Sequence, residues 1–225
     1  MGKKVAYIIT AHPDDESIFF SGLILSHTEV EWHVFCVTDG NADGNGQVRA
    51  DQFKRACLKL GVTKCEILGY PDVYEKRLDI DKLSAELSKL KTPDYVYTHG
   101  VLGEYGHPHH QDVCVATYRA FKEKTEVYSV AYNCHPDQVI TLDQDLYDIK
   151  THILVDIYHA ETRRFVNFIQ AYWSEGFSKV SLEEVEELYS YFTLREKPEL
   201  EKLKKFGWYW PYLEHNGGKV APRPF

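Results

Sequence analysis

Short apolar runs alternate with amphipathic stretches along the first half of the chain. Each run has the length of a buried strand and leads through a turn into a segment whose apolar residues recur at helical spacing. The expected strands are Val5–Ile9, Glu31–Val37, Cys65–Tyr70 and Asp94–His99, and the expected helices include Ser17–Leu23, Arg49–Leu60 and Asp79–Leu90. This order predicts an α/β, Rossmann-like fold, a mostly parallel sheet with helices on both faces and an active site at the carboxyl ends of the strands.

The pattern continues with weaker signals after residue 110. We expect helices at Gln111–Lys122, Ala160–Tyr172 and Ser181–Ser190 and strands at Val127–Tyr132 and Ile153–Ile157. The acidic helix Ser181–Ser190 is interpreted as having a solvated face. Five aromatic residues in Phe206–Tyr212 either anchor the C-terminus on the core, the commoner case, or stack on sugar rings. We expect one domain over residues 1–225, with residues 176–225 as an extension packed on it.

Composition narrows the class of protein. The 225 residues are 44% hydrophobic and 27% charged, as in soluble globular proteins, with no apolar run long enough to cross a bilayer. A net charge of −8 gives no basic surface, so we expect neither nucleic acid nor a membrane as partner. The five cysteines form no C-x-x-C pair, which favours a reducing cytoplasm. The composition is compatible with both a monomer and a homo-oligomer.

An acidic turn, Ala11–Glu16, follows the first predicted strand directly. It places His12, Asp14 and Asp15 within four positions at a strand's carboxyl end, where open α/β sheets bind their ligands. A helix N-cap would explain one of these acidic residues but not the cluster. The turn therefore predicts a metal or proton-transfer site.

A second cluster, His107, His109 and His110, follows the fourth predicted strand. These residues are either solvent-facing loop histidines or the partners of the acidic turn. His12, Asp15 and His110 would give two imidazoles and one carboxylate, the composition of a catalytic zinc site with an open fourth position. The same set suits non-haem iron, so Fe²⁺ is an alternative to Zn²⁺. Asp14 and His107 would remain as acid and base groups, which favours hydrolysis.

The loop after the second strand is rich in turn residues and leads to Arg49. Its glycines match neither a dinucleotide fingerprint nor a Walker phosphate loop. Arg49 is either a substrate clamp or a solvated residue at the start of a helix, and the sequence alone does not favour one over the other.

The pairing of Ala11–Glu16 with Tyr105–His110 resembles the PIG-L/LmbE-like family, zinc deacetylases that act on N-acetylglucosaminyl compounds and related amides. Similar segments extend the resemblance over residues 3–175, and they are Thr38–Gly40, Arg49, Gly69–Asp72, Val155–Asp156, Arg164 and Tyr172–Ser174. The family usually has Lys at the position of Arg164 and Gln at that of Glu175. Residues 176–225 resemble nothing that we identify.

The resemblance implies roles for individual residues. His12, Asp15 and His110 would be the zinc ligands and Asp14 the general base. His107 would be the acid group near the oxyanion, and the Tyr105 hydroxyl would help to polarise the amide carbonyl. The residues expected on the substrate side are Arg49, Asp39, His109 and Asp112.

One departure from the family concerns His109, where the family often has an Asp that orients the histidine two residues earlier. A neutral imidazole does not anchor a charged His107 as a carboxylate does. Either Asp112 or Glu104 replaces the missing carboxylate, or the pKa of His107 lies near its ordinary value of about 6.5. Gln52 stands where the family has Glu, which weakens any ion pair with Arg49.

The predicted function is metal-dependent removal of an acetyl group from an N-acetylated amino sugar or glycoconjugate, a small-molecule substrate. The alternatives are an amidase for a thiol-sugar conjugate or another acylated amine, and a sugar- or nucleotide-binding module without activity. A free carboxylate beside an open metal position argues against the binding module.

Overall fold

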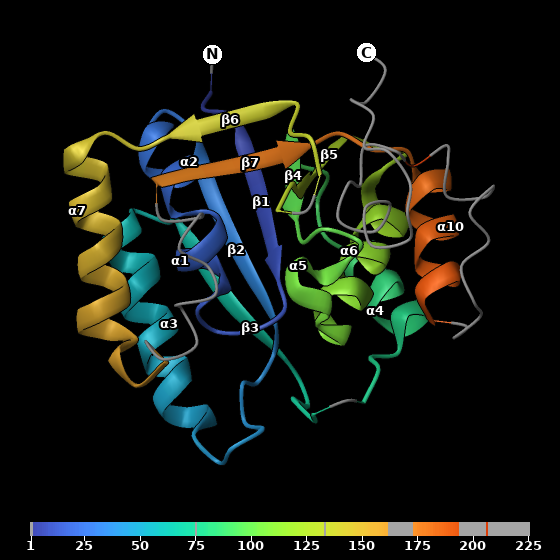
Figure 1. Ribbon diagram of the computed structural model, residues 1–225, viewed down its shortest axis with the longest axis horizontal. Coiled ribbons are helices and arrows are strands. Elements are labelled where there is room, and N and C mark those ends of the chain that lie inside the picture. The colour runs from blue at the N-terminus through green and yellow to red at the C-terminus, as the bar shows by residue number, and fades with distance from the viewer. Residues whose placement is uncertain (1, 75, 133, 162–172, 194–205, 207–225) are drawn as a thin grey trace, which may run out of the picture.

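The computed structural model describes residues 2–74, 76–132, 134–161, 173–193 and 206. A seven-stranded sheet in the order β3-β2-β1-β4-β5-β7-β6 forms its centre (Figure 1). The strands are β1 Val5–Thr10, β2 Glu31–Thr38, β3 Lys64–Tyr70, β4 Tyr95–Thr98, β5 Glu126–Val130, β6 Gln138–Thr141 and β7 Ser174–Ser178. Strands β1 to β5 are parallel to one another, whereas β7 runs antiparallel to both β5 and β6.

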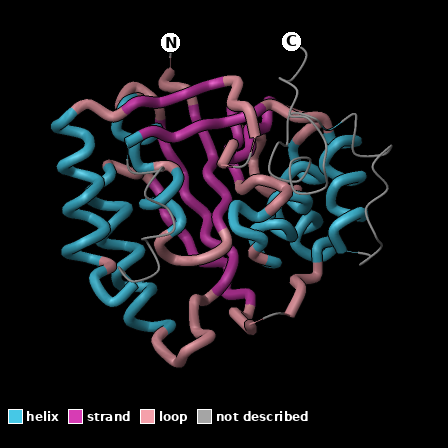
Figure 2. The backbone as a smooth tube through the Cα atoms, viewed as in Figure 1, coloured by secondary structure: helices cyan, strands magenta, loops and turns pink. Residues whose placement is uncertain are grey.

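Helices cover both faces of the sheet (Figure 2). Those of the first half are α1 Asp15–Phe19, α2 Ser21–Ser26, α3 Gly46–Leu60, α4 Ile80–Leu87, α5 Gly103–Gly106 and α6 Pro108–Phe121. In the second half, α7 Gln144–His152 runs into the π-helical turn Ile153–Ile157, then come the 3₁₀ turn His159–Glu161 and α10 Leu182–Thr193. The predicted fold class is confirmed: a mixed, mostly parallel sheet between two helical layers.

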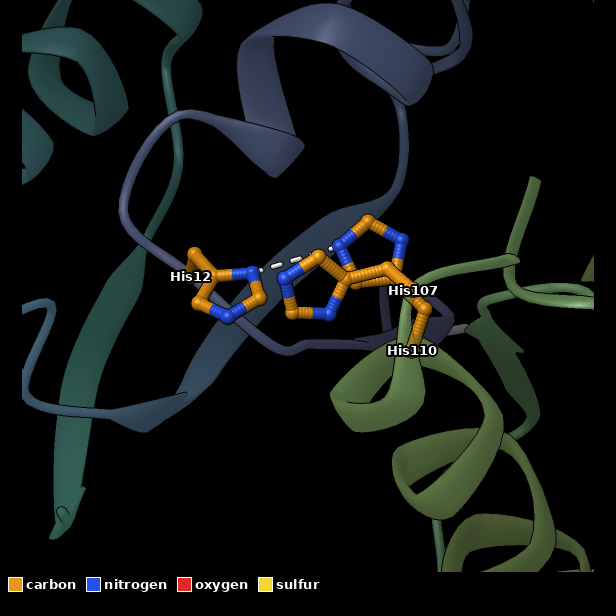
Figure 3. Close-up of side chains that lie close together, drawn as sticks. All are labelled: His12, His107 and His110. Atoms are coloured by element: carbon orange, nitrogen blue, oxygen red, sulfur yellow. Dashed lines mark hydrogen bonds between the residues drawn. The ribbon is translucent and has the colours of Figure 1, made fainter. Parts of the chain in front are cut away.

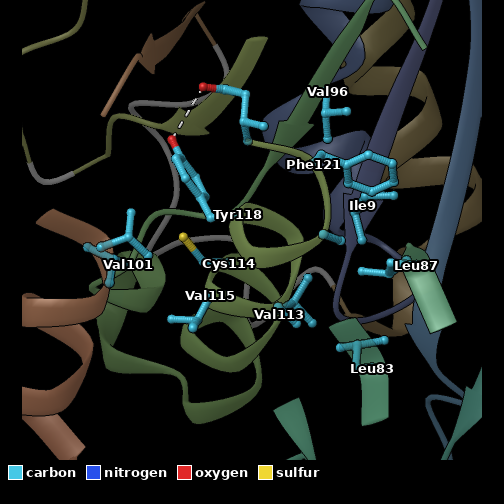
Figure 4. Packing of buried hydrophobic residues seen from close by; sticks show 14 of the residues in the cluster. Ile9, Leu83, Leu87, Val96, Val101, Val113, Cys114, Val115, Tyr118 and Phe121 are labelled. Atoms are coloured by element: carbon cyan, nitrogen blue, oxygen red, sulfur yellow. Dashed lines mark hydrogen bonds between the residues drawn. The ribbon is translucent and has the colours of Figure 1, made fainter. Parts of the chain in front are cut away.

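Strand β1 shows why the sheet is buried on both sides. Ala6 and Ile8 belong to a buried cluster with residues of α1 to α3, and Tyr7 and Ile9 belong to a second cluster with residues of α4 and α6. Figure 4 shows Ile9 in this second cluster, beside Leu87 of α4. These four residues of β1 are at most 6% exposed, as expected for a central parallel strand that reads as a continuous apolar run. Because β1 to β4 are parallel, the loops that follow them leave from one edge of the sheet.

Local signals set several helix ends as predicted. The Asp79 side chain accepts a hydrogen bond from the Lys82 amide and caps α4. Gly61 ends α3 in the left-handed conformation, with φ of 78°. Helix α6 begins earlier than expected, because Pro108 takes its first turn and His107 caps it. His109 and His110 therefore lie on a helix rather than in a loop.

The expected strand Ile153–Ile157 is wrong: this segment is a π-helical turn that extends α7. Ile153, Leu154 and Ile157 are buried while Val155 is 50% exposed, which is helical spacing. A short apolar run does not distinguish a strand from a helix turn by periodicity. Packing against α3 and α1 decides it here.

The antiparallel ribbon β6–β7 and helix α7 were not expected from the sequence. Strand β6 alternates half-buried and exposed positions and has only four residues, so its pattern is weak. The sheet continues beyond β5 because β7 pairs with it, Phe177 opposite Val130 and Ser178 opposite Ser129.

Part of the second half lies outside the described residues. The expected helix Ala160–Tyr172 is described only to Glu161, within a 3₁₀ turn, and residues 162–172, including Arg164, are outside. The acidic helix is confirmed as α10, with Val185 and Leu188 buried. Of the aromatic segment, Phe206 alone is described, and it is 4% exposed. Within the described part of the chain, no helix has the length and apolar character needed to cross a membrane.

Candidate metal centre and active site

The acidic turn and the start of α6 meet at the carboxyl edge of the sheet. His12 Nδ1 lies 3.2 Å from His110 Nε2 (Figure 3), and Asp15 Oδ2 lies 3.5 Å from His12 Nδ1. Asp15 Oδ1 is 3.5 Å from His110 Nε2. The structure thus brings together the three residues expected as metal ligands, although His110 lies 98 positions after His12 in the sequence.

The donor atoms have the spacing that a zinc ion requires. Ligand atoms at 2.0–2.1 Å from a tetrahedral zinc are separated by roughly 3.3 Å. The two ring nitrogens are 3.2 Å apart, and each lies 3.5 Å from one oxygen of Asp15, Oδ2 for His12 and Oδ1 for His110. Burial lowers the pKa of His12 to about 4, against the opposing effect of Asp15, so its ring is neutral and able to ligate. The residues present therefore fit a divalent ion with two imidazoles and one carboxylate.

Glu104 holds His110 in position for this task. Its Oε2 lies 2.5 Å from His110 Nδ1, so this nitrogen donates to the carboxylate and Nε2 is left free to ligate. Glu104 adopts a positive φ of 54°, an unfavourable backbone for a residue with a side chain. The sequence suggested Glu104 as a partner for His107, but in the structure Glu104 contacts His110, His99 and the Gly100 amide.

His99 completes this side of the cluster and was not predicted as a site residue. Its Nε2 lies 3.2 Å from Asp15 Oδ2 and its Nδ1 lies 3.2 Å from Glu104 Oε2. Burial alone would lower the pKa of His99, but the two carboxylates raise it to about 10. The sequence could have indicated His99 as a site residue, because it directly follows β4 and open α/β sheets bind their ligands at the carboxyl ends of their strands.

The other nitrogen of His12 faces His109 and Asp72. His109 Nε2 lies 2.8 Å from the Lys76 carbonyl, which only accepts, so His109 carries its proton there. His109 Nδ1 then accepts from His12 Nε2 at 3.1 Å, which leaves His12 Nδ1 unprotonated toward Asp15 and His110. Asp72 Oδ1 is 3.5 Å from His109 Nδ1. The residue that departs from the family pattern thus orients His12.

Asp14 has a strained backbone held by several contacts. Its φ of 127° is unfavourable for any residue with a side chain. The Asp14 amide donates to Glu16 Oε2 at 3.0 Å, and Arg49 Nη2 donates to Asp14 Oδ2 at 3.1 Å and to the Pro13 carbonyl at 2.7 Å. Burial raises the pKa of Asp14 well above its usual range, although Arg49 opposes this. A carboxyl group with a raised pKa is suited to accept and return a proton.

His107 and Tyr105 lie on the open side of the cluster. The centroids of the His107 and His12 rings are 4.6 Å apart, and Tyr105 is 54% exposed. Burial, followed by the neighbouring histidines, lowers the pKa of His107 below its ordinary value. Its Nδ1 accepts from the His109 amide at 3.2 Å, so the neutral ring presents Nε2–H as a donor.

Two residues expected on the substrate side bond elsewhere. Asp112 accepts from Arg77 Nη1 at 2.9 Å, the Leu78 amide at 2.8 Å and the Tyr189 hydroxyl at 2.7 Å. It therefore ties the loop before α4 and helix α10 to α6 rather than orienting His107. Asp39 Oδ1 accepts from the amides of Asn41 and Asp72, both at 3.0 Å, and fixes the loops after β2 and β3.

A cavity of about 340 Å³ opens over the cluster. Its walls include His12, Asp14, His107, Arg49 and Asp72. A larger cavity of about 1020 Å³ lies at the opposite edge of the sheet, and its lining includes none of the residues of the metal cluster. The smaller cavity is therefore the candidate substrate site.

Comparison with known proteins agrees with this geometry. The family model for GlcNAc-PI de-N-acetylase, PIG-L, matches residues 7–121. A probable N-acetylglucosaminyl-phosphatidylinositol de-N-acetylase of Dictyostelium discoideum is 26% identical over 134 residues, which cover 55% of this chain and 51% of the relative. The chain spans about half the length of that relative.

Two solved structures share the fold. The N,N'-diacetylchitobiose deacetylase of Pyrococcus horikoshii has a TM-score of 0.59 at 22% identity, covering 80% of this chain and 85% of its own. The 4-carboxy-2-hydroxymuconate hydratase of Pseudomonas putida has a TM-score of 0.56 at 19% identity, covering 79% and 96%. The fold by itself therefore does not specify the reaction. The family match spans more than half of the residues, including both halves of the metal cluster, and the chain belongs to the PIG-L family.

Proposed function

We propose that this protein is a metal-dependent hydrolase that removes the acetyl group from an N-acetylated amino sugar or glycoconjugate. The observation that carries the proposal is the triangle of His12, Asp15 and His110 donor atoms, with the Asp14 carboxyl group beside it at the base of a cavity. The names of the Dictyostelium and Pyrococcus proteins support an N-acetylglucosaminyl substrate.

We assign zinc as the ion, with Fe²⁺ as the alternative that the same ligands accept. Two other possible ligand sets also include His110. One combines it with His12 and His107, and the other combines it with Asp15 and His99. We prefer His12, Asp15 and His110 because Glu104 and His109 fix the ring orientations of both histidines. In this assignment His99 and His107 stay unligated.

The reaction follows from the positions of the side chains. A bound zinc ion lowers the pKa of a water molecule and polarises a carbonyl oxygen. Asp14 takes the proton that the attacking water gives up as its oxygen bonds to the acetamide carbon. The carbon–nitrogen bond then breaks, Asp14 returns the proton to the leaving amine, and acetate is released. Water and amide are consumed, and amine and acetate are formed.

The carbonyl oxygen gains negative charge during the attack, and two side chains are suited to stabilise it. Neutral His107 offers its Nε2–H, and Tyr105 offers its hydroxyl from the exposed side of the cavity. Arg49 acts on Asp14 rather than on the substrate, because its guanidinium holds the carboxylate and the Pro13 carbonyl.

Metal analysis and acetate release on a panel of N-acetyl sugars test the proposal. We expect about one zinc or iron per chain and acetate release that a chelator abolishes and zinc restores. A metal-loaded protein that releases no acetate from any N-acetyl amine, including acylated thiol-sugar conjugates, would overturn the hydrolase assignment. Addition of water to an unsaturated acid instead would indicate a hydratase.

A further inference from the structure

The cavity above the metal cluster is lined by acidic and aromatic side chains. Asp14, Asp43 and Asp72 contribute three carboxyl groups, and Tyr74 and Tyr105 contribute two aromatic rings. Arg49 is the only Lys or Arg among the described residues that line it. The side chains around the substrate therefore differ from the cluster of free cations that usually recognises a phosphate group.

Both terminal nitrogens of the Arg49 guanidinium already contact protein oxygens, while its Nε is buried and has no hydrogen-bond partner among the described residues. Arg49 is 4% exposed, and its Nη2 donates to the Pro13 carbonyl and Asp14 Oδ2 at 2.7 and 3.1 Å. Its Nη1 lies 3.5 Å from the Gly40 carbonyl and 3.8 Å from Asp72 Oδ2. An incoming phosphate would have to break these contacts and expose two buried carboxyl groups.

Asp43 adds a negative charge at the rim. It is exposed on the loop between β2 and α3. Burial by itself would raise its pKa, but the hydrogen bonds from Asn45 and the charge of Arg49 together lower it. A phosphate ester carries about −1.5 to −2 charges at neutral pH and would meet this carboxylate at the entrance. Repulsion of this kind suppresses wrong partners.

Tyr74 stands at the mouth with 80% of its surface exposed. A large exposed aromatic ring beside a cavity provides a flat apolar surface with a polar tip, which suits a sugar ring. Its position on the loop after β3 places it outside the metal cluster, where the unit next to the reacting sugar would lie.

We propose, building on the deacetylase function above, that the site selects an uncharged oligosaccharide. Its N-acetylated terminal sugar lies at the metal cluster, the neighbouring sugar packs on Tyr74, and Asp43 with Asp72 excludes phosphorylated sugars.

The test compares three substrates of the metal-loaded enzyme: N-acetylglucosamine, its β-linked disaccharide, and its 6-phosphate. At low ionic strength we expect kcat/KM to be about tenfold higher for the disaccharide, and about tenfold lower for the phosphate, than for the monosaccharide. Added salt should narrow the phosphate difference, since exposed charges are screened beyond about 10 Å at 0.1 M. A phosphorylated sugar that matches or exceeds the neutral one overturns the proposal.

Matched variants separate the effect of the Tyr74 ring from that of the Asp43 charge. Tyr74→Ala should lower the disaccharide-to-monosaccharide ratio of kcat/KM severalfold, and Tyr74→Phe should keep it, because the ring is retained. Asp43→Asn should raise the phosphate-to-neutral ratio, whereas Asp51→Asn, which removes an exposed carboxylate of α3 outside the cavity, should not. Unchanged ratios in Tyr74→Ala and Asp43→Asn contradict the proposed roles.

Calorimetric binding of the same three sugars is measured in parallel. If no sugar is hydrolysed, the deacetylase function fails, yet the order of affinities still decides the preference for uncharged ligands. Tighter binding of the phosphate than of the disaccharide overturns the inference even where acetate is released.

Discussion

Two buried carboxylates of this protein have different surroundings. Glu175 on β7 accepts from Lys150 Nζ at 2.7 Å and from the amides of Gly22 and Leu23 at 2.7 and 2.8 Å. Asp15 accepts from the His12 amide at 2.7 Å, and its other neighbours are the imidazoles of His12, His99 and His110 at 3.2–3.5 Å. The first carboxylate is paired with the ammonium group of Lys150, and the second faces three imidazole rings, of which those of His12 and His110 belong to the candidate metal site.

The difference shows how burial alone fails to identify a functional site. Lys150 and Glu175 are 0% and 3% exposed, and their charges compensate within one ion pair that joins α7, β7 and α2. Around Asp15, ring nitrogens converge with the spacing of ligand atoms, and Glu104 and His109 fix their orientation. A buried charge with a complete partner is compensated within the fold, whereas converging donors around a carboxylate have the arrangement of a metal site.

The largest effect is expected from removing a ligand. His110→Ala should reduce the metal content from about one ion per chain to near zero and lower acetate release by at least about 10⁴-fold, since two ligands do not retain a catalytic ion. Added zinc should raise the Tm of the wild type but not of the variant. Lys54→Met, at an exposed position on α3, is the control. Metal retained by His110→Ala would exclude this residue as a ligand.

Loss of the proton acceptor should come next. Asp14→Asn keeps the three ligands, so metal content should be unchanged while kcat falls by about 10²–10⁴-fold. Elemental analysis and steady-state kinetics measure the two quantities on one preparation. If Asp14→Asn loses the metal and Asp15→Asn keeps it, the roles of the two carboxylates are reversed.

Breaking the ion pair between Lys150 and Glu175 should lower stability and leave metal binding unchanged. Lys150→Met leaves the Glu175 carboxylate buried without its cation and should lower the free energy of unfolding by about 3–5 kcal/mol in urea titrations. Adding Glu175→Gln should recover most of this loss, because an amide needs no counter-charge. The folded single variant should still bind one metal ion, and loss of metal would show that the two networks are coupled.

A smaller effect is expected at the carboxylate that orients a ligand. Glu104→Gln removes the charge beside His110 Nδ1 and should weaken zinc affinity by about 10- to 100-fold, measured by competition with a chelator. Glu86→Gln is a matched control, since that carboxylate bonds Tyr70 away from the cluster. Unchanged affinity in Glu104→Gln would mean that His110 is oriented by its packing.

The smallest effect isolates backbone strain at Asp14. Both Asp14→Gly and Asp14→Ala remove the carboxylate and its contact with Arg49, so their difference reports the φ of 127°. Asp14→Gly should be more stable than Asp14→Ala by about 1–2 kcal/mol, because glycine tolerates this conformation. Equal stability would indicate that the turn relaxes once the side chain is lost.

The sequence predicted the parallel half of the sheet well and the antiparallel half poorly. Strands β1, β2 and β4 are largely buried runs and β3 is a partly exposed edge strand. Clear turn signals follow these strands, so their pattern is specified locally. β6 and β7 are short and of mixed character, and they pair only because β5 offers an edge. The π-helical turn after α7 differs from the predicted strand, since its four apolar residues fit both structures until packing selects one.

For the site, the sequence by itself determined which chemical groups the chain carries: two imidazoles and a carboxylate able to ligate, a second carboxylate beside them, and the histidine that replaces the family's Asp. Only the tertiary structure decided what each group does. Glu104 bonds to His110 rather than His107, His109 orients His12, Asp112 bonds to Arg77, and Arg49 is bound to Asp14. These pairings join residues from different loops, and their distances depend on how the strands and helices pack, which no local pattern encodes.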